Sequence, residues 1–436
     1  MLASYATDSN GNVTGLVGGD GGVIKLKQAN TLAVVGDSIT SSWRNISSGV
    51  SAVNERVSKG YLSWALGLSG ERLTVISDQS IGGSRLTSAG SGSDINLTQL
   101  PLAIASGASH LLIQGGVNDI IGGVSLSTIK TAYLSIISKA IGAGMNVWIL
   151  TIPTLNSAHG SYSVAYQGII FALNDWLRQQ VATQYAKQGV VVVDTASKTI
   201  DPVSATGSYI TNGSYDNLHP RNLGAYRMGK ELARMWSLFI PQSVTTLSSN
   251  ADNYGYSANS SNILDNGLFV NGAAPATGFT RSLTGTAGVS SETLVSRADG
   301  YGNDLTEVCT FAANNDSVRV TTTSAHTRVS DGDKLYAECE ISVSGMTNCR
   351  CVRLNLVAQG ATTNTTATTM QLDSTNDLAL TEDYTMLYRT NVIEVDTAIL
   401  GALSNVSSQV TVFGSGAGGA TVKIGRWSIR KVTATE

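Results

Sequence analysis

The chain has 436 residues, and its 28 Lys and Arg residues nearly balance its 31 Asp and Glu residues, which gives a formal net charge of -3. This balance excludes the strongly basic surface of nucleic-acid-binding proteins, so no nucleic-acid partner is expected. Because no apolar stretch approaches the roughly 20 residues of a membrane span, no membrane span is expected either. The length allows two or three domains.

Residues 1–28 predict an N-terminal extended arm or connector. They are rich in Gly, Asn and Asp, which favour tight turns. They lack the basic start and the apolar run of a secretory signal peptide. We therefore expect a protein that is made in the cytoplasm without a signal peptide.

Residues 29–242 alternate short aliphatic runs with longer segments of helical period. The runs predict five buried strands, which are TLAVVG (31–36), RLTVIS (72–77), SHLLIQGG (109–116), NVWILTIP (146–153) and GVVVVD (189–194). Helices are expected over 60–68, 97–106, 125–142, 162–187 and 220–238, with Gly189 as the C-cap of the fourth. The alternation predicts an α/β fold, with three α/β/α layers around a five-stranded parallel sheet.

The last part of the chain, residues 263–436, follows a polar linker over 243–262. Apolar and polar residues alternate there in DSVRVTTTS (316–324), KLYAECEISVSG (334–345), CVRLNLVAQG (351–360), TMLYRTNVIEV (385–395), SQVTVFG (408–414) and ATVKIGRWSIRKV (420–432). Such alternation is typical of half-buried antiparallel strands. We expect a β-sandwich or jelly-roll domain.

The same part of the chain contains all four cysteines, Cys309, Cys339, Cys349 and Cys351. The last two flank a single residue, which is too short a spacing for a zinc site, and no His is near in sequence. Buried thiols on β-strands are favoured, with a disulfide as the alternative, and no metal is expected. Asp331 and Asp333 in VSDGDK could ligate calcium, but a hairpin turn with solvated acids is favoured.

Chemistry-bearing residues follow the first two predicted strands, at the sheet edge where α/β folds bind ligands. Ser38 comes directly after Gly36 and Asp37, and its hydroxyl would lie near backbone N–H groups that favour an oxyanion. It is either a nucleophile or part of a helix N-cap. Gly82 and Gly83 follow the second strand, where a backbone N–H could approach a substrate or the loop could simply be flexible.

Further candidates follow the third and fifth strands. Asn118 could direct its amide at a developing oxyanion, or form an Asx-turn, and Asp119 could brace the loop. Asp216 and His219 are three residues apart, so the carboxylate can accept from one imidazole nitrogen while the other accepts a proton from a serine. The alternative for this pair is a surface cap. Together the four strand ends supply a nucleophile, oxyanion donors and a base.

The blocks GDSIT (36–40), SIGGS (80–84), GGVND (115–119) and DNLHP (216–220) resemble the four signature blocks of the SGNH, or GDSL-type, serine hydrolases. The resemblance covers about residues 31–240 and implies a flavodoxin-like domain. It implies a catalytic set of Ser38, Asp216 and His219. It also implies an oxyanion hole of Ser38, Gly83 and Asn118, with Gly82 as the alternative to Gly83.

The resemblance further implies ester hydrolysis through an acyl-serine, without a metal or an organic cofactor. The predicted rim loops are polar, which favours an O-acetylated glycan or polysaccharide as substrate. Two alternatives stay open: a lipid or thioester hydrolase, and a non-catalytic glycan-binding or adhesion protein. Trp43, Tyr162, Tyr209 and Tyr215 could stack on a sugar ring or serve as ordinary packing.

Two weaker resemblances concern the ends of the chain. Residues 262–272 (NILDNGLFVNG) resemble the start of carbohydrate-binding jelly-roll modules, and the N-terminal arm resembles the ends of phage tail-fibre and tailspike proteins. They imply a virion component, acting on a bacterial surface polysaccharide as a homo-oligomer, with a trimer as the expected state.

Overall fold

A computed structural model of the chain describes residues 4–7, 13–17, 23–24, 29–44, 55–242, 246–247, 249, 252, 261–323, 325–372 and 377–432. For the first three segments the backbone alone is described. Most of the expected linker over 243–262 lies outside these residues. The chain forms two compact units, Met1–Ser42 with Gly60–Ser243, and Trp43–Lys59 with Val244–Glu436.

The N-terminal arm contains three short strands, β1 (Ser4–Thr7), β2 (Val13–Val17) and β3 (Val23–Ile24). They form an antiparallel sheet in the order β1-β2-β3. The arm therefore contains paired strands, and it belongs to the first unit.

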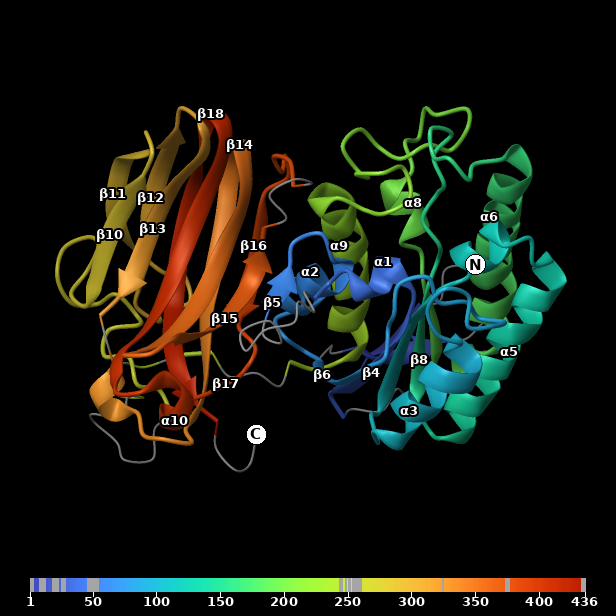
Figure 1. Ribbon diagram of the computed structural model, residues 1–436, viewed down its shortest axis with the longest axis horizontal. Coiled ribbons are helices and arrows are strands. Elements are labelled where there is room, and N and C mark those ends of the chain that lie inside the picture. Colours follow the sequence, from blue (N-terminus) through green and yellow to red (C-terminus); the bar gives the residue numbers. More distant parts are fainter. Residues whose placement is uncertain are drawn as a thin grey trace. The chain divides into compact units, whose positions relative to one another are not determined.

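The core of the first unit is the predicted five-stranded parallel sheet (Figure 1). Its strands are β4 (Thr31–Gly36), β6 (Thr74–Asp78), β7 (His110–Gln114), β8 (Asn146–Leu150) and β9 (Val190–Val193). All neighbours pair in parallel, in the order β6-β4-β7-β8-β9. The aliphatic runs are continuous because helices cover both faces of a parallel sheet.

Helices cover the sheet in two layers (Figure 1). The principal helices are α2 (Tyr61–Leu68) and α9 (Asn222–Phe239) on one face, and α3 (Leu100–Ala105), α5 (Leu126–Gly142) and α6 (Val164–Trp176) on the other. Gly229 allows α9 to approach α2 closely, since a side chain there would lie 2.6 Å from the Tyr61 carbonyl oxygen. The α/β/α prediction is confirmed.

Two helix predictions need correction. The expected helix over 162–187 is divided into α6, η3 (Leu177–Val181), α7 (Ala182–Gln184) and η4 (Ala186–Gln188). Gly189 ends it with φ +82°, as predicted for a C-cap. The last helix begins at Asn222, two residues after Pro220.

The strand order places the switch point of the sheet beside β4. The chain runs from β4 to β6 on one side and then crosses to β7 on the other side. Loops that leave neighbouring strands in opposite directions open a crevice at their carboxyl ends, and ligands bind there. Gly36 and Gln114, the last residues of β4 and β7, are direct register partners.

The second unit is a β-rich, mainly antiparallel domain, as expected for a sandwich. Its strands are β5 (Glu55–Val57), β10 (Phe279–Thr284), β11 (Gly288–Ser296), β12 (Asn303–Phe311), β13 (Asn314–Thr322), β14 (Lys334–Gly360), β15 (Asn364–Gln371), β16 (Tyr384–Arg389), β17 (Ile393–Glu394) and β18 (Leu403–Lys431). The two longest, β14 and β18, each combine two strands that the sequence predicted separately.

The pairing divides this sheet into two halves. Half-sheet A has the order β11-β12-β18-β14-β16 and uses the end of β18 and the start of β14. Half-sheet B has the order β10-β13-β18-β14-β15-β5 and uses the start of β18 and the end of β14. The register shifts between Ser344 and Cys351 mark the passage from one half to the other. Gly418 fits there because a side chain would overlap the Thr347 carbonyl oxygen.

β5 was not predicted from the sequence. It lies between the first strand and first long helix of the α/β unit, but it pairs in parallel with β15 of the second unit. The Trp43 carbonyl accepts from Val57 N at 2.7 Å, and both residues lie in the segment Trp43–Lys59 that belongs to the second unit. A three-residue strand has too little alternation to stand out from its surroundings.

Several surface and core features bear on the other predictions. All four cysteines are buried thiols on β12 and β14, as predicted. Asp331 accepts from Thr397, and Asp333 accepts from Ser330 and pairs with Lys431.

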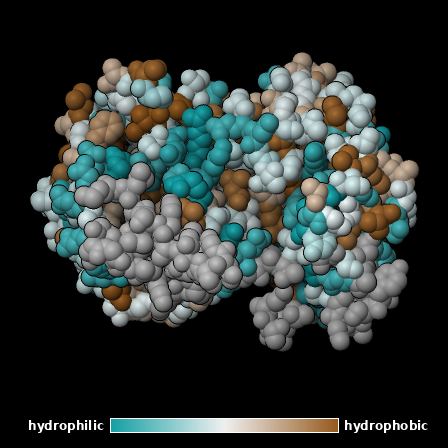
Figure 2. All heavy atoms as spheres, turned by 180° about the vertical axis from the view of Figure 1, so that it is seen from behind, coloured by the Kyte–Doolittle hydropathy of each residue, from teal (hydrophilic) through white to brown (hydrophobic). Residues whose placement is uncertain are grey.

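No helix among the described residues is long and apolar enough to span a bilayer. On the face shown in Figure 2, apolar residues form small patches among hydrophilic ones.

Candidate active site

The nucleophile candidate lies on the tight turn from β4 into α1 (Ser38–Ser41). Gly36 is needed at this turn because a side chain would lie 2.6 Å from the Gln114 carbonyl oxygen. Asp37, and not Ser38, caps the helix, with its Oδ1 accepting from Ile39 N at 3.0 Å. The hydroxyl of Ser38 is therefore available for another partner.

That partner is His219. Ser38 Oγ lies 2.7 Å from His219 Nε2, across a sequence separation of 181 residues. On the other side of the ring, His219 Nδ1 lies 2.6 Å from Asp216 Oδ2. With Nδ1 donating to the carboxylate, Nε2 can accept the serine proton, which is the arrangement of a serine hydrolase triad.

The loop that presents His219 is fixed from several sides. Asp216 Oδ1 accepts from the backbone N–H of His219 at 2.7 Å. The buried Tyr209 hydroxyl donates to the Leu218 carbonyl at 2.7 Å, and the Ser214 hydroxyl donates to the His219 carbonyl at 2.7 Å. These contacts keep the imidazole oriented.

The electrostatics keep Asp216 ionised. Partial burial alone would raise the pKa of Asp216, but hydrogen bonds from the side chain and backbone of His219, together with the charge of its ring, outweigh this effect. The pKa of Asp216 falls to about 2. The carboxylate can therefore stabilise an imidazolium without accepting its proton.

The glycine pair and Asn118 lie at the same edge. The Cβ position of Gly82 lies 3.7 Å from Ser38 Cβ, whereas Gly83 has φ +77° and a side chain there would overlap Ser91. Within the described residues, the N–H groups of Gly82 and Gly83 make no hydrogen bond. Asn118 donates one amide hydrogen to the Ser84 carbonyl at 3.0 Å, which leaves the second amide hydrogen for another acceptor.

Two buried side chains, Gln99 and Asp119, hold these loops together. Gln99, at the end of η2 (Ile95–Gln99), accepts from Gly36 N at 2.8 Å and donates to Ser84 Oγ at 2.9 Å. Asp119, in α4 (Val117–Ile121), accepts from Leu86 N at 2.9 Å. Gln99 was missed because a lone polar residue in an apolar helical segment is normally assigned to the surface. Asp119 matches its predicted bracing role.

The four aromatic candidates have different environments. Tyr215 stacks on the His219 ring, with centroids 5.6 Å apart and planes at 13°. Tyr209 is buried beneath the catalytic loop, so it is a packing residue. Trp43 is also buried and belongs to the second unit. Tyr162 is half-buried and donates its N–H to the His159 carbonyl.

Asp37 contributes a second, unexpected carboxyl group. It is fully buried, and its Oδ2 has no hydrogen-bond partner. Burial raises the pKa of Asp37 to about 7, although the hydrogen bond from Ile39 N and the nearby His219 oppose the shift. In the described part of the chain, no group of three or more His, Cys, Asp or Glu residues could hold a metal ion.

Comparison with protein families places a family domain over this site. Residues 34–227 match the family model described as the GDSL-like lipase/acylhydrolase family. The matched residues include Ser38, Asn118, Asp216 and His219. No curated protein matches the chain.

Solved structures of such proteins are similar to part of the chain. A member of the lipolytic protein G-D-S-L family from Veillonella parvula DSM 2008 is 15% identical, with 48% of this chain and 99% of that chain covered and a TM-score of 0.35. A GDSL-like lipase from Bacteroides thetaiotaomicron VPI-5482 is 13% identical, with 48% of this chain and 90% of that chain covered and a TM-score of 0.35. An acetylxylan esterase from Geobacillus stearothermophilus is 16% identical, with 48% of this chain and 95% of that chain covered and a TM-score of 0.36.

Replacement of Asp37 should change how stability depends on pH. The unfolded chain loses this proton near the ordinary value of 3.8, whereas the folded state keeps it to about 7. Between these values the folded state binds more protons, so this carboxyl lowers the free energy of unfolding by up to roughly 1.4 kcal/mol for each unit of rising pH. Asp37→Asn should remove that slope in urea unfolding measured from pH 4 to 8. Parallel curves for wild type and variant would contradict the assignment.

Tyr215 should act through His219. We expect Tyr215→Ala to lower kcat for a small ester about 2-fold to 10-fold, because one ring contact is lost. Tyr215→Phe keeps the ring and should stay within about twofold of wild type. An unchanged kcat with a higher KM would instead show that Tyr215 contacts the substrate.

Proposed function

We propose that this chain, whose residues 34–227 form a domain of the GDSL-like lipase/acylhydrolase family, is a serine esterase that removes O-acetyl groups from a carbohydrate. The observation that carries the proposal is the hydrogen-bonded series from Ser38 through His219 to Asp216. Each of these side chains already has the distance and the partner that nucleophilic catalysis needs.

The reaction would follow from this geometry in two halves. As Ser38 Oγ attacks the acyl carbon, its proton passes to His219 Nε2, and the carbonyl oxygen becomes an oxyanion. The bond from the acyl carbon to the sugar oxygen then breaks, and His219 returns the proton to that oxygen. Water repeats the sequence on the acyl-serine, which releases acetate and restores Ser38. Asp216 stays ionised and stabilises the imidazolium in both halves.

We assign the oxyanion donors to the N–H groups beside the nucleophile. Ser38 is the first residue of α1, so its N–H has no acceptor within the helix. The unoccupied N–H groups of Gly82 and Gly83 and the second amide hydrogen of Asn118 supply the remaining candidates. Gly82 becomes a stronger candidate than the sequence suggested, because it lies directly beside Ser38.

The polarity of the rim supports a sugar ester as substrate. Residues 88–91 (SAGS), which follow the glycine pair, are exposed, as are residues 157 and 158 of another rim loop. A lipid or thioester hydrolase is the second candidate, because Ile81 is 48% exposed one residue before Gly82. The non-catalytic alternative receives no support from a site with all its expected side chains in place.

The proposal extends to the rest of the molecule. We propose that the second unit recognises the polysaccharide, and that the protein acts as a virion component at a bacterial surface. The support is the resemblance of residues 262–272 to carbohydrate-binding modules and of the N-terminal arm to phage tail proteins.

Hydrolysis assays test the catalytic proposal. Ser38→Ala should lower acetate release from acetylated polysaccharides by at least about a thousandfold, with an unchanged melting temperature. Ser41→Ala, on the same helix, is the matched control and should keep activity. The wild type should hydrolyse a 4-nitrophenyl acetyl ester faster than a dodecanoyl ester. The reverse preference would support the lipid candidate, and full activity of Ser38→Ala would contradict the assigned nucleophile.

Light scattering tests the proposed assembly. A tail-associated protein of this kind should form a trimer, with about three times the chain mass of 45.4 kDa. A monomeric mass at micromolar concentration would contradict this part of the proposal while leaving the esterase assignment untouched.

A further inference from the structure

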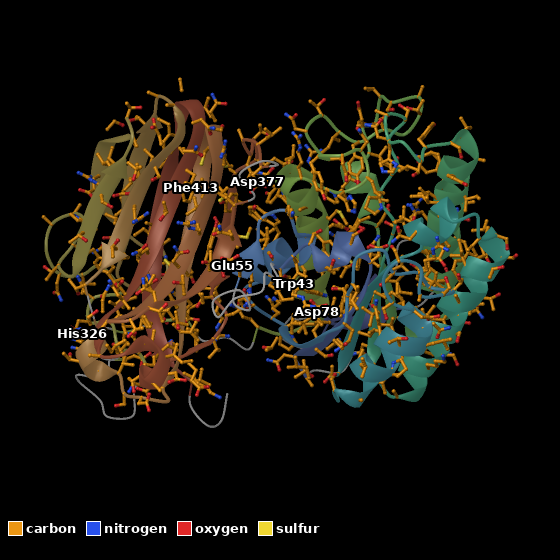
Figure 3. All side chains as sticks on the ribbon, viewed as in Figure 1. Trp43, Glu55, Asp78, His326, Asp377 and Phe413 are labelled. Carbon is orange, nitrogen blue, oxygen red and sulfur yellow. The ribbon has the colours of Figure 1, made fainter. Side chains whose placement is uncertain are left out.

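One face of half-sheet B carries an unusual set of polar side chains. They come from three adjacent strands: Arg319 on β13, Thr411 and Gln409 on β18, and Arg353 and Asn355 on β14. Arg319 and Arg353 are both direct register partners of Thr411. We call these five residues, together with Phe413 on β18, the polar face. Figure 3 labels Phe413.

The alternation of the strands explains why these side chains share one face. Their neighbours Val318, Val410, Val412 and Leu354 are buried and belong to the apolar core. Successive side chains of a strand point to opposite faces, so the polar face is the reverse side of this core layer. An amphipathic sheet needs polar residues here for solubility, but it does not need buried ones.

Several atoms of the polar face are buried without a partner. They are Nε of Arg319, Nε of Arg353, Oγ1 of Thr411 and Oδ1 of Asn355. Thr411 is fully buried and Asn355 is 8% exposed. A buried polar atom without a hydrogen bond destabilises the fold by about 1–3 kcal/mol, so four on adjacent strands call for a ligand or water that satisfies them.

The charge of the two arginines is only partly balanced, by the Glu55 carboxylate on β5, which raises the pKa of Arg353. Within the described residues no ion pair joins Arg319 or Arg353 to a carboxylate, and Arg353 makes one hydrogen bond, from Nη1 to Gln371 Oε1 at 3.2 Å. Burial lowers the pKa of Arg353, and the charge of Arg319 lowers it further, with Glu55 opposing. Two strand spacings separate the arginines by about 10 Å, so one anionic ligand above Thr411 could contact both.

Phe413 adds an apolar surface to this charge. The Arg353 guanidinium carbon lies 4.8 Å from the Phe413 ring centroid, so the ring is held in place beside the charged group. Phe413 is half-buried, which leaves part of it accessible. A sugar presents C–H groups that pack on an aromatic ring and hydroxyls that accept and donate hydrogen bonds, and the polar face offers complements to both.

We propose that the polar face binds an acidic polysaccharide, with carboxylate or phosphate groups held between Arg319 and Arg353, sugar hydroxyls bonded to Thr411 and Asn355, and a sugar ring packed on Phe413. Arginine recognises both oxyanions through paired hydrogen bonds. That this polymer is also the acetylated substrate rests on the proposed function. The binding itself does not, because every residue of the polar face belongs to the second unit.

The test is binding of the full chain to matched polymers, measured by affinity electrophoresis. The acidic probes are polygalacturonate, alginate and hyaluronate for carboxylate, and dextran phosphate for phosphate, with neutral dextran as the reference. The wild type should bind at least one acidic probe about tenfold or more tightly than dextran, and this preference should weaken as salt rises from about 0.05 M to 0.5 M. Equal or absent binding across the panel would overturn the proposal.

Three variants identify the face. Arg319→Gln and Arg353→Gln should each weaken binding to the acidic probe about tenfold or more. Lys423→Gln, which removes the same charge from an exposed position on β18, is the matched control and should bind like wild type. Thr411→Val removes an unpartnered hydroxyl, so it should weaken binding without lowering the melting temperature.

Activity separates this proposal from the esterase assignment. All three variants should hydrolyse a 4-nitrophenyl acetyl ester at the wild-type rate. If Lys423→Gln weakened binding as much as Arg319→Gln does, the assignment of binding to the polar face would be overturned. Loss of acetyl-ester hydrolysis in the wild type would contradict the proposed function and leave the binding result to stand by itself.

Discussion

The hydrogen bond between Ser38 and His219 is the constraint on which the functional part of this molecule depends. It joins two residues 181 positions apart at 2.7 Å, and it forms only if β4, the sheet edge and the loop before α9 all occupy their observed places. A shift of about 1 Å in any of these would separate the nucleophile from its base. The parallel sheet fixes these positions. Functional residues follow β4, β6 and β7, and all three strands end at the same edge of the sheet.

The buried polar residues around the site serve this constraint. Gln99 joins the turn of Gly36 to Ser84, Asn118 joins α4 to the same loop, and Tyr209 supports the loop of His219. Buried hydrogen bonds of this kind fix loops that would otherwise sample many conformations. Asp37 has a different character, since half of its carboxyl group is unpartnered. A destabilising group beside the nucleophile is consistent with a site shaped by function more than by stability.

Much of the α/β unit could be predicted from the sequence, since buried strands and amphipathic helices have distinct periods. The run TLAVVG coincides with β4, and the site residues follow from which strand ends carry polar side chains. Long-range pairing was less accessible. Two predicted strands proved to be one continuous β14, because periodicity does not reveal whether a break is a turn or a bend. β5 and Gln99 were missed, because each depends on partners distant in sequence.

The two units divide the chemistry between them. The first concentrates its functional side chains at one sheet edge around a nucleophile, whereas the second spreads polar side chains over the face of a sheet. Such a face suits an extended polymer, and a narrow catalytic edge suits a single ester group. The proposed enzyme would therefore bind its polymer over one unit and cleave acyl groups in the other.

The most direct test of the catalytic account is covalent labelling with a fluorophosphonate, followed by peptide mass spectrometry. The account predicts a single adduct on Ser38, formed rapidly in the wild type and slowly when His219 is replaced, because the imidazole activates the hydroxyl. An adduct on a different serine, or labelling of Ser38 at the same rate without His219, would contradict it.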